Sequence, residues 1–96
     1  MSKIPEIDEA LEEINACEDL LRPYEYSRPA ARVLQGLTRL RELLERPSAA
    51  AVDEALDMIR RGEQAVEPYR YRGPVEDLLK HAAKLREHLT EAKKKL

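Results

Sequence analysis

The sequence predicts an all-α protein, an up-down-up-down four-helix bundle made of two tandem helical hairpins. Three observations support this prediction. The chain repeats itself with an offset of 45 residues, apolar residues recur at helical spacing in four segments, and acidic and basic segments alternate. With 96 residues the chain is long enough for one core and too short for two, so we expect a single domain over residues 1–96.

The internal repeat aligns residues 4–44 with residues 49–89 without a gap and gives 15 identities in 41 pairs. Its most distinctive part is the pattern Pro-Tyr-x-Tyr-x-x-Pro, which begins at Pro23 in the first unit and at Pro68 in the second. Regular helices and a duplication fit both an engineered bundle and an old gene duplication, and the divergence of the copies favours a natural origin. Scarce Asn and Gln beside abundant Glu and Arg indicate a thermostable chain.

Each unit is predicted to form helix, loop and helix. The first helix should end near Arg22, because the residue before Pro23 avoids the helical conformation. Residues 24–28 form the loop, and Pro29 suits the first turn of the second helix. The apolar stripe of the first helix is Ile7, Leu11, Ile14 and Leu21, and that of the second is Ala30, Val33, Leu34, Leu37, Leu40 and Leu44.

The second unit follows the same plan. Pro47 ends the second helix, and Ser48 is the expected N-cap of the third. Gly73 and Pro74 open the fourth helix, and the short loops make consecutive helices antiparallel neighbours. The third stripe is Val52, Leu56, Ile59 and Val66, and the fourth is Val75, Leu78, Leu79, Ala82, Leu85 and Leu89. No segment alternates with period two over strand length, so we expect no sheet.

Charge favours a closed square of helices. The net charge is −5 over residues 1–24, +2 over 25–46, −3 over 47–69 and +4 over 70–96. In a square each acidic helix lies between two basic ones, which selects this topology over its rivals. The competing architecture is a two-repeat solenoid in which the basic helices stack side by side. Because the square separates the basic helices and the whole chain carries −2, we expect no nucleic-acid binding.

Cysteine content and hydropathy bear on the compartment. Cys17 is the only cysteine, so an intramolecular disulfide is impossible and a reducing compartment is the simplest interpretation. No basic-then-apolar segment opens the chain, and the longest apolar run, residues 49–52, is far shorter than a membrane span. We therefore expect a cytoplasmic protein without membrane contact.

The two Pro-Tyr loops contain all four tyrosines and emerge at the same end of an up-down bundle. Tyrosine offers an apolar ring with a polar tip, and arginine pairs with carboxylate or phosphate, so this end suits an anionic or aromatic ligand, or a partner protein. The candidate binding residues are Tyr24, Tyr26, Tyr69, Tyr71, Arg28, Arg70 and Arg72, with Arg22 nearby. The structural alternative is that each tyrosine covers the open end of the core and hydrogen-bonds a frayed helix carbonyl.

Other chemistry-bearing residues have simpler interpretations. His81 and His88 are about 10 Å apart along one helix face, too far to share a metal ion, so we expect surface histidines. Cys17 lies on an apolar face and aligns with Gly62, and small residues at equivalent positions indicate a close helix–helix contact around a core cysteine. The chain has no phosphate loop, zinc-ligand spacing or nucleophile elbow, so we expect no cofactor, metal or catalytic residue.

This pattern predicts a non-catalytic interaction or structural module rather than an enzyme, whether a natural protein or a designed bundle scaffold. Such a module can bind a partner protein or associate with itself as a homodimer. The alternative function is binding of a small anionic or aromatic ligand by the tyrosine- and arginine-rich loop end.

Overall fold

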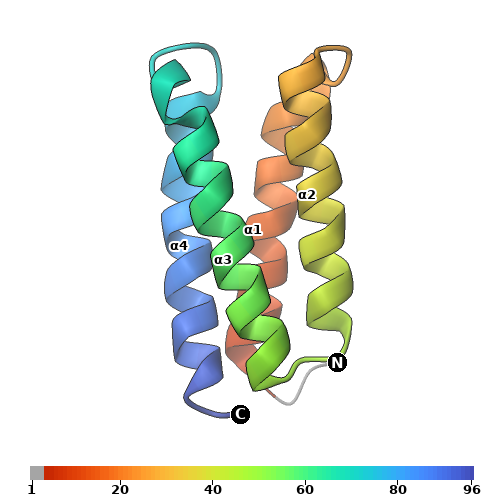
Figure 1. Ribbon diagram of the computed structural model, residues 1–96, viewed down its shortest axis with the longest axis vertical. Coiled ribbons are helices and arrows are strands. Elements are labelled where there is room, and N and C mark those ends of the chain that lie inside the picture. The colour runs from red at the N-terminus through yellow and green to blue at the C-terminus, as the bar shows by residue number, and fades with distance from the viewer. Residues whose placement is uncertain (1–3) are drawn as a thin grey trace.

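The computed structural model describes residues 4–96, so residues 1–3 of the expected domain lie outside the described part of the chain. Over residues 4–96 the chain forms four α-helices and no strand, in an up-down-up-down bundle (Figure 1). Short 3-10 turns follow the first and third helices. The elements are α1 (Pro5–Leu21), a 3-10 turn (Arg22–Tyr24), α2 (Arg28–Glu45), α3 (Ala49–Val66), a 3-10 turn (Glu67–Tyr69) and α4 (Val75–Lys93). The predicted four-helix bundle is confirmed.

Local signals in the sequence explain where the helices begin. The Ser48 side chain accepts a hydrogen bond from the Ala51 amide at 3.0 Å, so the expected cap of α3 is confirmed. Ser27 caps α2 in the same way through the Ala30 amide at 3.3 Å. Before α4 the chain turns at Gly73, whose φ of +52° lies in the left-handed region that favours glycine.

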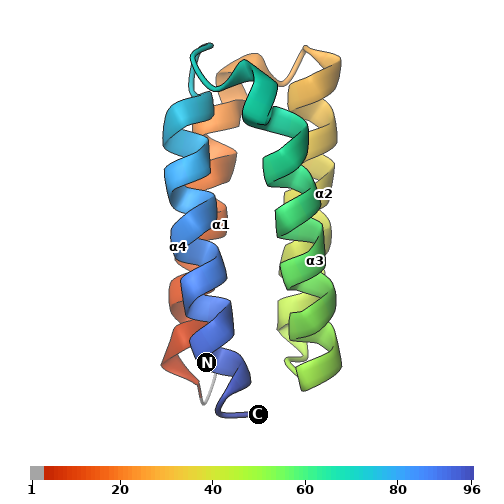
Figure 2. The same cartoon turned by 60° about the vertical axis from the view of Figure 1, so that its left-hand side comes forward.

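The four helices close into a square. Each helix packs against its two neighbours, and the contact between α1 and α4, which are far apart in the sequence, is the most extensive. Figure 2 shows α1 beside α4 and α2 beside α3, with the two Pro-Tyr loops together at one end. The stacked solenoid alternative is wrong, because a solenoid does not bring the first helix against the last.

Ion pairs between helices follow the predicted charge alternation. Among residues 4–96, every ion pair that joins two helices takes its acid from α1 or α3 and its base from α2, from α4 or from Lys95, which follows α4. These pairs are Glu18–Arg41, Glu54–Arg39, Glu63–Arg86, Asp53–Lys93, Glu13–His81, Glu9–His88 and Glu6–Lys95. Because most of these side chains are partly exposed, each pair contributes little to the free energy of unfolding. Together the pairs favour this order of helices around the square over other topologies.

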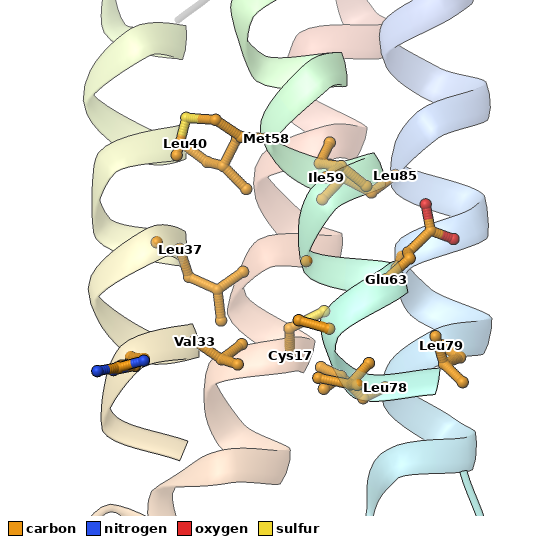
Figure 3. Close-up of a pocket in the computed structure, with 16 residues that line it drawn as sticks. Cys17, Val33, Leu37, Leu40, Met58, Ile59, Glu63, Leu78, Leu79 and Leu85 are labelled. Carbon is orange, nitrogen blue, oxygen red and sulfur yellow. The ribbon is translucent and has the colours of Figure 1, made fainter. Parts of the chain in front are cut away.

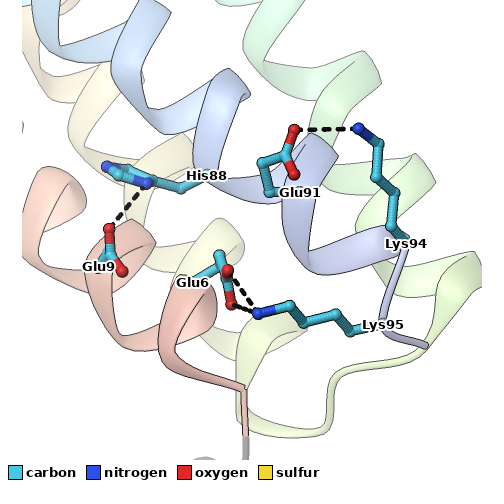
Figure 4. A network of polar contacts seen from close by, with 6 residues as sticks. All are labelled: Glu6, Glu9, His88, Glu91, Lys94 and Lys95. Atoms are coloured by element: carbon cyan, nitrogen blue, oxygen red, sulfur yellow. Dashed lines mark hydrogen bonds and ion pairs between the residues drawn. The ribbon is translucent and has the colours of Figure 1, made fainter.

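Two of the pairs on the α1–α4 side, Glu6–Lys95 and Glu9–His88, lie near the chain ends (Figure 4), whereas Glu13–His81 lies farther along the two helices. Lys95 Nζ lies 2.7 Å from a Glu6 carboxylate oxygen, and His88 Nδ1 lies 3.1 Å from Glu9. The hydrogen bond from Lys95 lowers the pKa of Glu6 below its usual value. The sequence-distant termini of the bundle are therefore tied together by charge as well as by apolar packing.

The core is sealed at one end of the bundle and looser at the other. Near the chain ends and the α2–α3 connection, Ile7, Val52 and Leu89 are at most 1% exposed. Toward the Pro-Tyr loops, Val33 and Val66 are only partly buried although they lie on the predicted apolar stripes. The loop end of the bundle therefore offers apolar surface that the helices themselves do not fill.

Candidate ligand-binding site at the loop end

The four tyrosines fall into two classes. Tyr24 and Tyr69, the first tyrosine of each Pro-Tyr loop, are 40% and 48% exposed and line a common hollow. Tyr26 and Tyr71, the second of each loop, are 85% and 87% exposed and do not line it. Within residues 4–96 no hydrogen bond involves a tyrosine hydroxyl, so the expected bond to a frayed carbonyl is not present there.

The hollow between the Pro-Tyr loops, called here the tip hollow, has a volume of about 310 Å³. The Tyr24 ring packs on the backbone of Gly73, and its hydroxyl oxygen lies 3.5 Å from the point a Cβ would occupy there. The Arg72 guanidinium lies 5.8 Å from the centre of the Tyr69 ring, a cation–π distance. One loop thus supports the tyrosine of the other, while Arg72 brings a positive charge to the wall.

The candidate arginines are distributed unevenly. Arg72 lines the tip hollow, whereas Arg28 is exposed outside it. Arg70 pairs with Glu67 of its own loop, Nε to Oε1 at 3.0 Å. The structure therefore brings Tyr24, Tyr69 and Arg72 together and leaves the other candidates on the outer surface of the loops.

A second hollow, called here the interior cavity, adjoins the tip hollow and has a volume of about 230 Å³. It is open to solvent along part of its wall, where Arg32, Gly62 and Ala65 are exposed. Figure 3 shows its lining side chains, which come from all four helices. Val33, Val66 and Leu78 line both hollows, so the two are stacked along the bundle. The remaining lining is mostly aliphatic, with Cys17, Leu37, Leu40, Met58, Ile59, Leu79, Ala82 and Leu85 among it.

Two glycines border the interior cavity on its half-open side, where Gly36 is half-buried and Gly62 is exposed. Gly36 of α2 and Gly62 of α3 line it, and a Cβ built on either meets no heavy atom within 4 Å. The expected close helix contact around Cys17 and Gly62 is therefore wrong on the Gly62 side. A glycine inside a helix costs about 0.5–1 kcal/mol relative to alanine, and here no tight packing requires it. Gly36 and Gly62 have in common that both line the interior cavity.

The thiol of Cys17 is buried, with an exposed fraction of 1%. Burial raises its pKa to about 12, and the nearby Glu13 and Glu18 carboxylates act in the same direction. A thiol in this state is protonated at neutral pH and is a poor nucleophile. Cys17 therefore contributes apolar lining to the cavity, as expected for a core cysteine.

Neither histidine joins a cluster of metal ligands. His81 Nδ1 lies 2.7 Å from Glu13 and His88 Nδ1 lies 3.1 Å from Glu9, so both imidazoles bridge α4 to α1. In the described part of the chain, no group of three or more His, Cys, Asp or Glu side chains is placed to hold a metal ion. The histidines act as partners of the acidic helix.

One polar pair borders the interior cavity. Glu63 is one of the lining residues, and its Oε1 lies 2.7 Å from Nε of Arg86. This contact is an ion pair rather than a hydrogen bond, because the Arg86 Nε–H does not point at the carboxylate. Glu18 and Arg41 form the equivalent pair in the first repeat, 45 positions earlier. The negative charge in the cavity wall is thus compensated by its own hairpin.

Sequence reasoning located the tip but missed the interior cavity. Val33, Val66 and Ala82 look like core positions in the sequence, and their periodicity does not distinguish a filled position from one that borders a hollow. The available signal was Gly36 and Gly62, two glycines inside otherwise helical apolar patterns, which cost stability unless packing or function uses them.

No family model, curated protein or solved structure matches the chain. None of the helices within residues 4–96 has the length and apolar character needed to cross a membrane.

Proposed function

We propose that the protein is a non-catalytic binding module that holds a small organic anion at its loop end. The observation that carries this proposal is the tip hollow, where Arg72 and the rings of Tyr24 and Tyr69 line a space between the two Pro-Tyr loops. Arginine supplies a permanent positive charge for a carboxylate, and the tyrosines supply hydroxyl groups beside apolar rings. The buried, protonated thiol of Cys17 supports a role in binding rather than in nucleophilic chemistry.

Electrostatics at the loop end favour an anion. Residues 22–28 and 67–74 together contain four arginines and two glutamates, a net charge of +2, so the rest of the chain carries −4. The first turn of α4 adjoins the hollow, and its cap residue Pro74 supplies no side-chain acceptor for the leading N–H groups. Glu76 and Asp77 in that turn are exposed and do not line the hollow.

The test uses benzoate and short aliphatic carboxylates at millimolar concentration with thermal unfolding as the readout. A ligand at ten times its Kd should add about 1.4 kcal/mol to the free energy of unfolding. Arg72→Gln should abolish this gain. Arg60→Gln, which changes an exposed arginine on α3 outside the hollow, should preserve it. Absence of stabilisation by any organic anion, or equal stabilisation of the Arg72→Gln variant, would contradict the proposal.

A second candidate function rests on the outward tyrosines. Tyr26 and Tyr71 occupy equivalent positions in the two repeats and are almost fully exposed beside unpaired loop arginines such as Arg28. Tyrosine and arginine are enriched among residues that dominate protein interfaces. The positive charge of the loop end fits an acidic partner surface. A second copy of this chain offers such a surface, because its residues outside the loops carry a net charge of −4.

Sedimentation velocity at low and high salt tests this self-association. A dimer that dissociates as salt rises, and that is lost in a Tyr26→Ser, Tyr71→Ser double variant, supports it. A monomer at all salt concentrations up to millimolar protein contradicts the homodimer.

A further inference from the structure

We propose that the anion bound at the tip carries an unbranched aliphatic tail that enters the interior cavity, as in a medium-chain fatty acid. This inference rests on the proposed function of the tip hollow and specifies the class of its ligand. The observation that carries it is the stacking of the two hollows, which share Val33, Val66 and Leu78. A ligand anchored at Arg72 therefore faces apolar space along the bundle axis.

The dimensions of the combined space fit a chain rather than a compact ring. On α4 the lining runs from Val75 in the tip hollow to Leu85 at the far side of the interior cavity. Ten residues of α-helix span about 15 Å. A space that is long and bordered by four helices suits a linear tail that follows the helix axes.

The chemistry of the interior cavity fits an apolar occupant. Its lining is mostly aliphatic, and its volume of about 230 Å³ exceeds the roughly 150 Å³ of an apolar protein cavity that holds benzene, so it has room for an apolar group. The carboxylate of Glu63 in the wall is paired with Arg86 at 2.7 Å, and Arg32 at the rim is exposed. No uncompensated buried charge among the described residues opposes entry of a hydrocarbon tail.

Two positions in the wall of the interior cavity are glycines and carry no side chain. At Gly36 and Gly62 a side chain would meet nothing within 4 Å, so both positions have room for a larger residue that the sequence does not place there. The two positions lie on different helices and border the same cavity. Gly36 is half-buried and Gly62 is exposed, so neither position adds a side chain to this part of the wall, and part of the space beside them is open to solvent.

A chain-length series tests the inference on the unchanged protein. Hexanoate, octanoate and decanoate are titrated calorimetrically below the concentrations at which they form micelles. We expect affinity to rise about fourfold for each added CH₂, the fold change that corresponds to about 0.8 kcal/mol per buried CH₂. Decanoate should therefore bind about 250-fold tighter than hexanoate.

Two variants locate the tail. Ala82→Leu places a larger side chain in the interior cavity and should weaken decanoate binding at least tenfold while leaving hexanoate within twofold. The matched control is Ala50→Leu, an exposed position in the first turn of α3 at the opposite end, which should change neither affinity. Circular dichroism of each variant verifies the helical fold, and the chain-length series does not depend on any variant.

Decanol tests the head group. It shares the tail and lacks the charge, so it should bind the unchanged protein at least tenfold more weakly than decanoate, and the difference should vanish in Arg72→Gln. Affinity that does not depend on chain length while short anions bind overturns the tail inference and leaves the proposed function standing. Equal binding of decanol and decanoate, with no effect of Arg72→Gln, overturns both, because the charge is then not recognised at the tip.

Discussion

Single glycine residues occupy two different kinds of position in the bundle. Gly36 and Gly62 lie inside helices where alanine would be the better helix former, and neither approaches another helix closely. Gly73 has a different role, because its φ of +52° is one that residues with a Cβ rarely adopt. The three glycines of the chain therefore respond to substitution in opposite directions.

Replacement of these glycines by alanine should separate the two roles. Gly36→Ala and Gly62→Ala should each raise the free energy of unfolding by about 0.5–1 kcal/mol, because the helix gains a better former at no steric cost. Gly73→Ala should lower it by about 1–2 kcal/mol, because the backbone conformation there is strained for alanine. Urea unfolding followed by circular dichroism measures all three. Destabilisation by Gly36→Ala or Gly62→Ala would show that these positions are tightly packed.

The thiol of Cys17 should be nearly inert in the folded protein. Its pKa is raised to about 12 by burial, compared with about 8.5 for an exposed cysteine, so at pH 8 the thiolate fraction falls roughly 2,000-fold. Alkylation by iodoacetamide at pH 8, followed by mass spectrometry, should be slower by about that factor than in guanidinium chloride. Similar rates in the folded and unfolded chain would contradict a buried Cys17.

At the scale of helices, each repeat carries an equivalent ion pair that ties its two helices together. Glu18 on α1 pairs with Arg41 on α2, and Glu63 on α3 pairs with Arg86 on α4. The acidic side chains are 16% and 19% exposed, which makes these pairs less screened by solvent than the others in their hairpins. The glutamate and the arginine are identical in the two repeats, and in both repeats they form the same ion pair between the two helices.

Double-mutant cycles measure the worth of these pairs. The cycle that combines Glu18→Gln with Arg41→Met should give a coupling of about 1 kcal/mol, because the pair is partly buried. The exposed pair of Asp57 and Arg61 on α3, whose side chains are 67% and 68% exposed, serves as the control and should give about 0.3–0.5 kcal/mol. Equal couplings in the two cycles would show that partial burial adds nothing to the hairpin pair.

The sequence could predict helices and topology because those depend on patterns within the chain. The Ser48 cap, the prolines after α1 and α2, and the alternation of net charge all act locally or pairwise. The interior cavity depends instead on how far facing helices stand apart, and periodicity in one helix carries no information about that distance. For this reason the sequence predicts Val33, Ala82 and Leu44 alike as core residues. In the structure Leu44 is buried, with 2% of its surface exposed, whereas Val33 and Ala82 are only partly buried.

The same limit applies to the candidate site. Because both Pro-Tyr loops follow the ends of helices that run in the same direction, the sequence could place all four tyrosines at one end of the bundle. It could not separate Tyr24 and Tyr69, which face the hollow, from Tyr26 and Tyr71, which do not, because one residue of shift in a turn reverses the direction of a side chain. The asymmetry between Arg28 and Gly73 at equivalent repeat positions further distinguishes the two loops.

At the scale of the whole molecule, one half of the bundle has a sealed core, and the other half contains two adjoining, partly open hollows beneath a basic tip. Methyl NMR of the protein titrated with decanoate tests this division most directly. The account predicts shifts at the methyl groups of Val33, Val66 and Leu78, which line both hollows, and none at Val52 and Leu89, which are fully buried at the sealed end. Shifts of equal size at Val52 and Leu89, or bound decanoate that leaves Val33, Val66 and Leu78 unchanged, would contradict it.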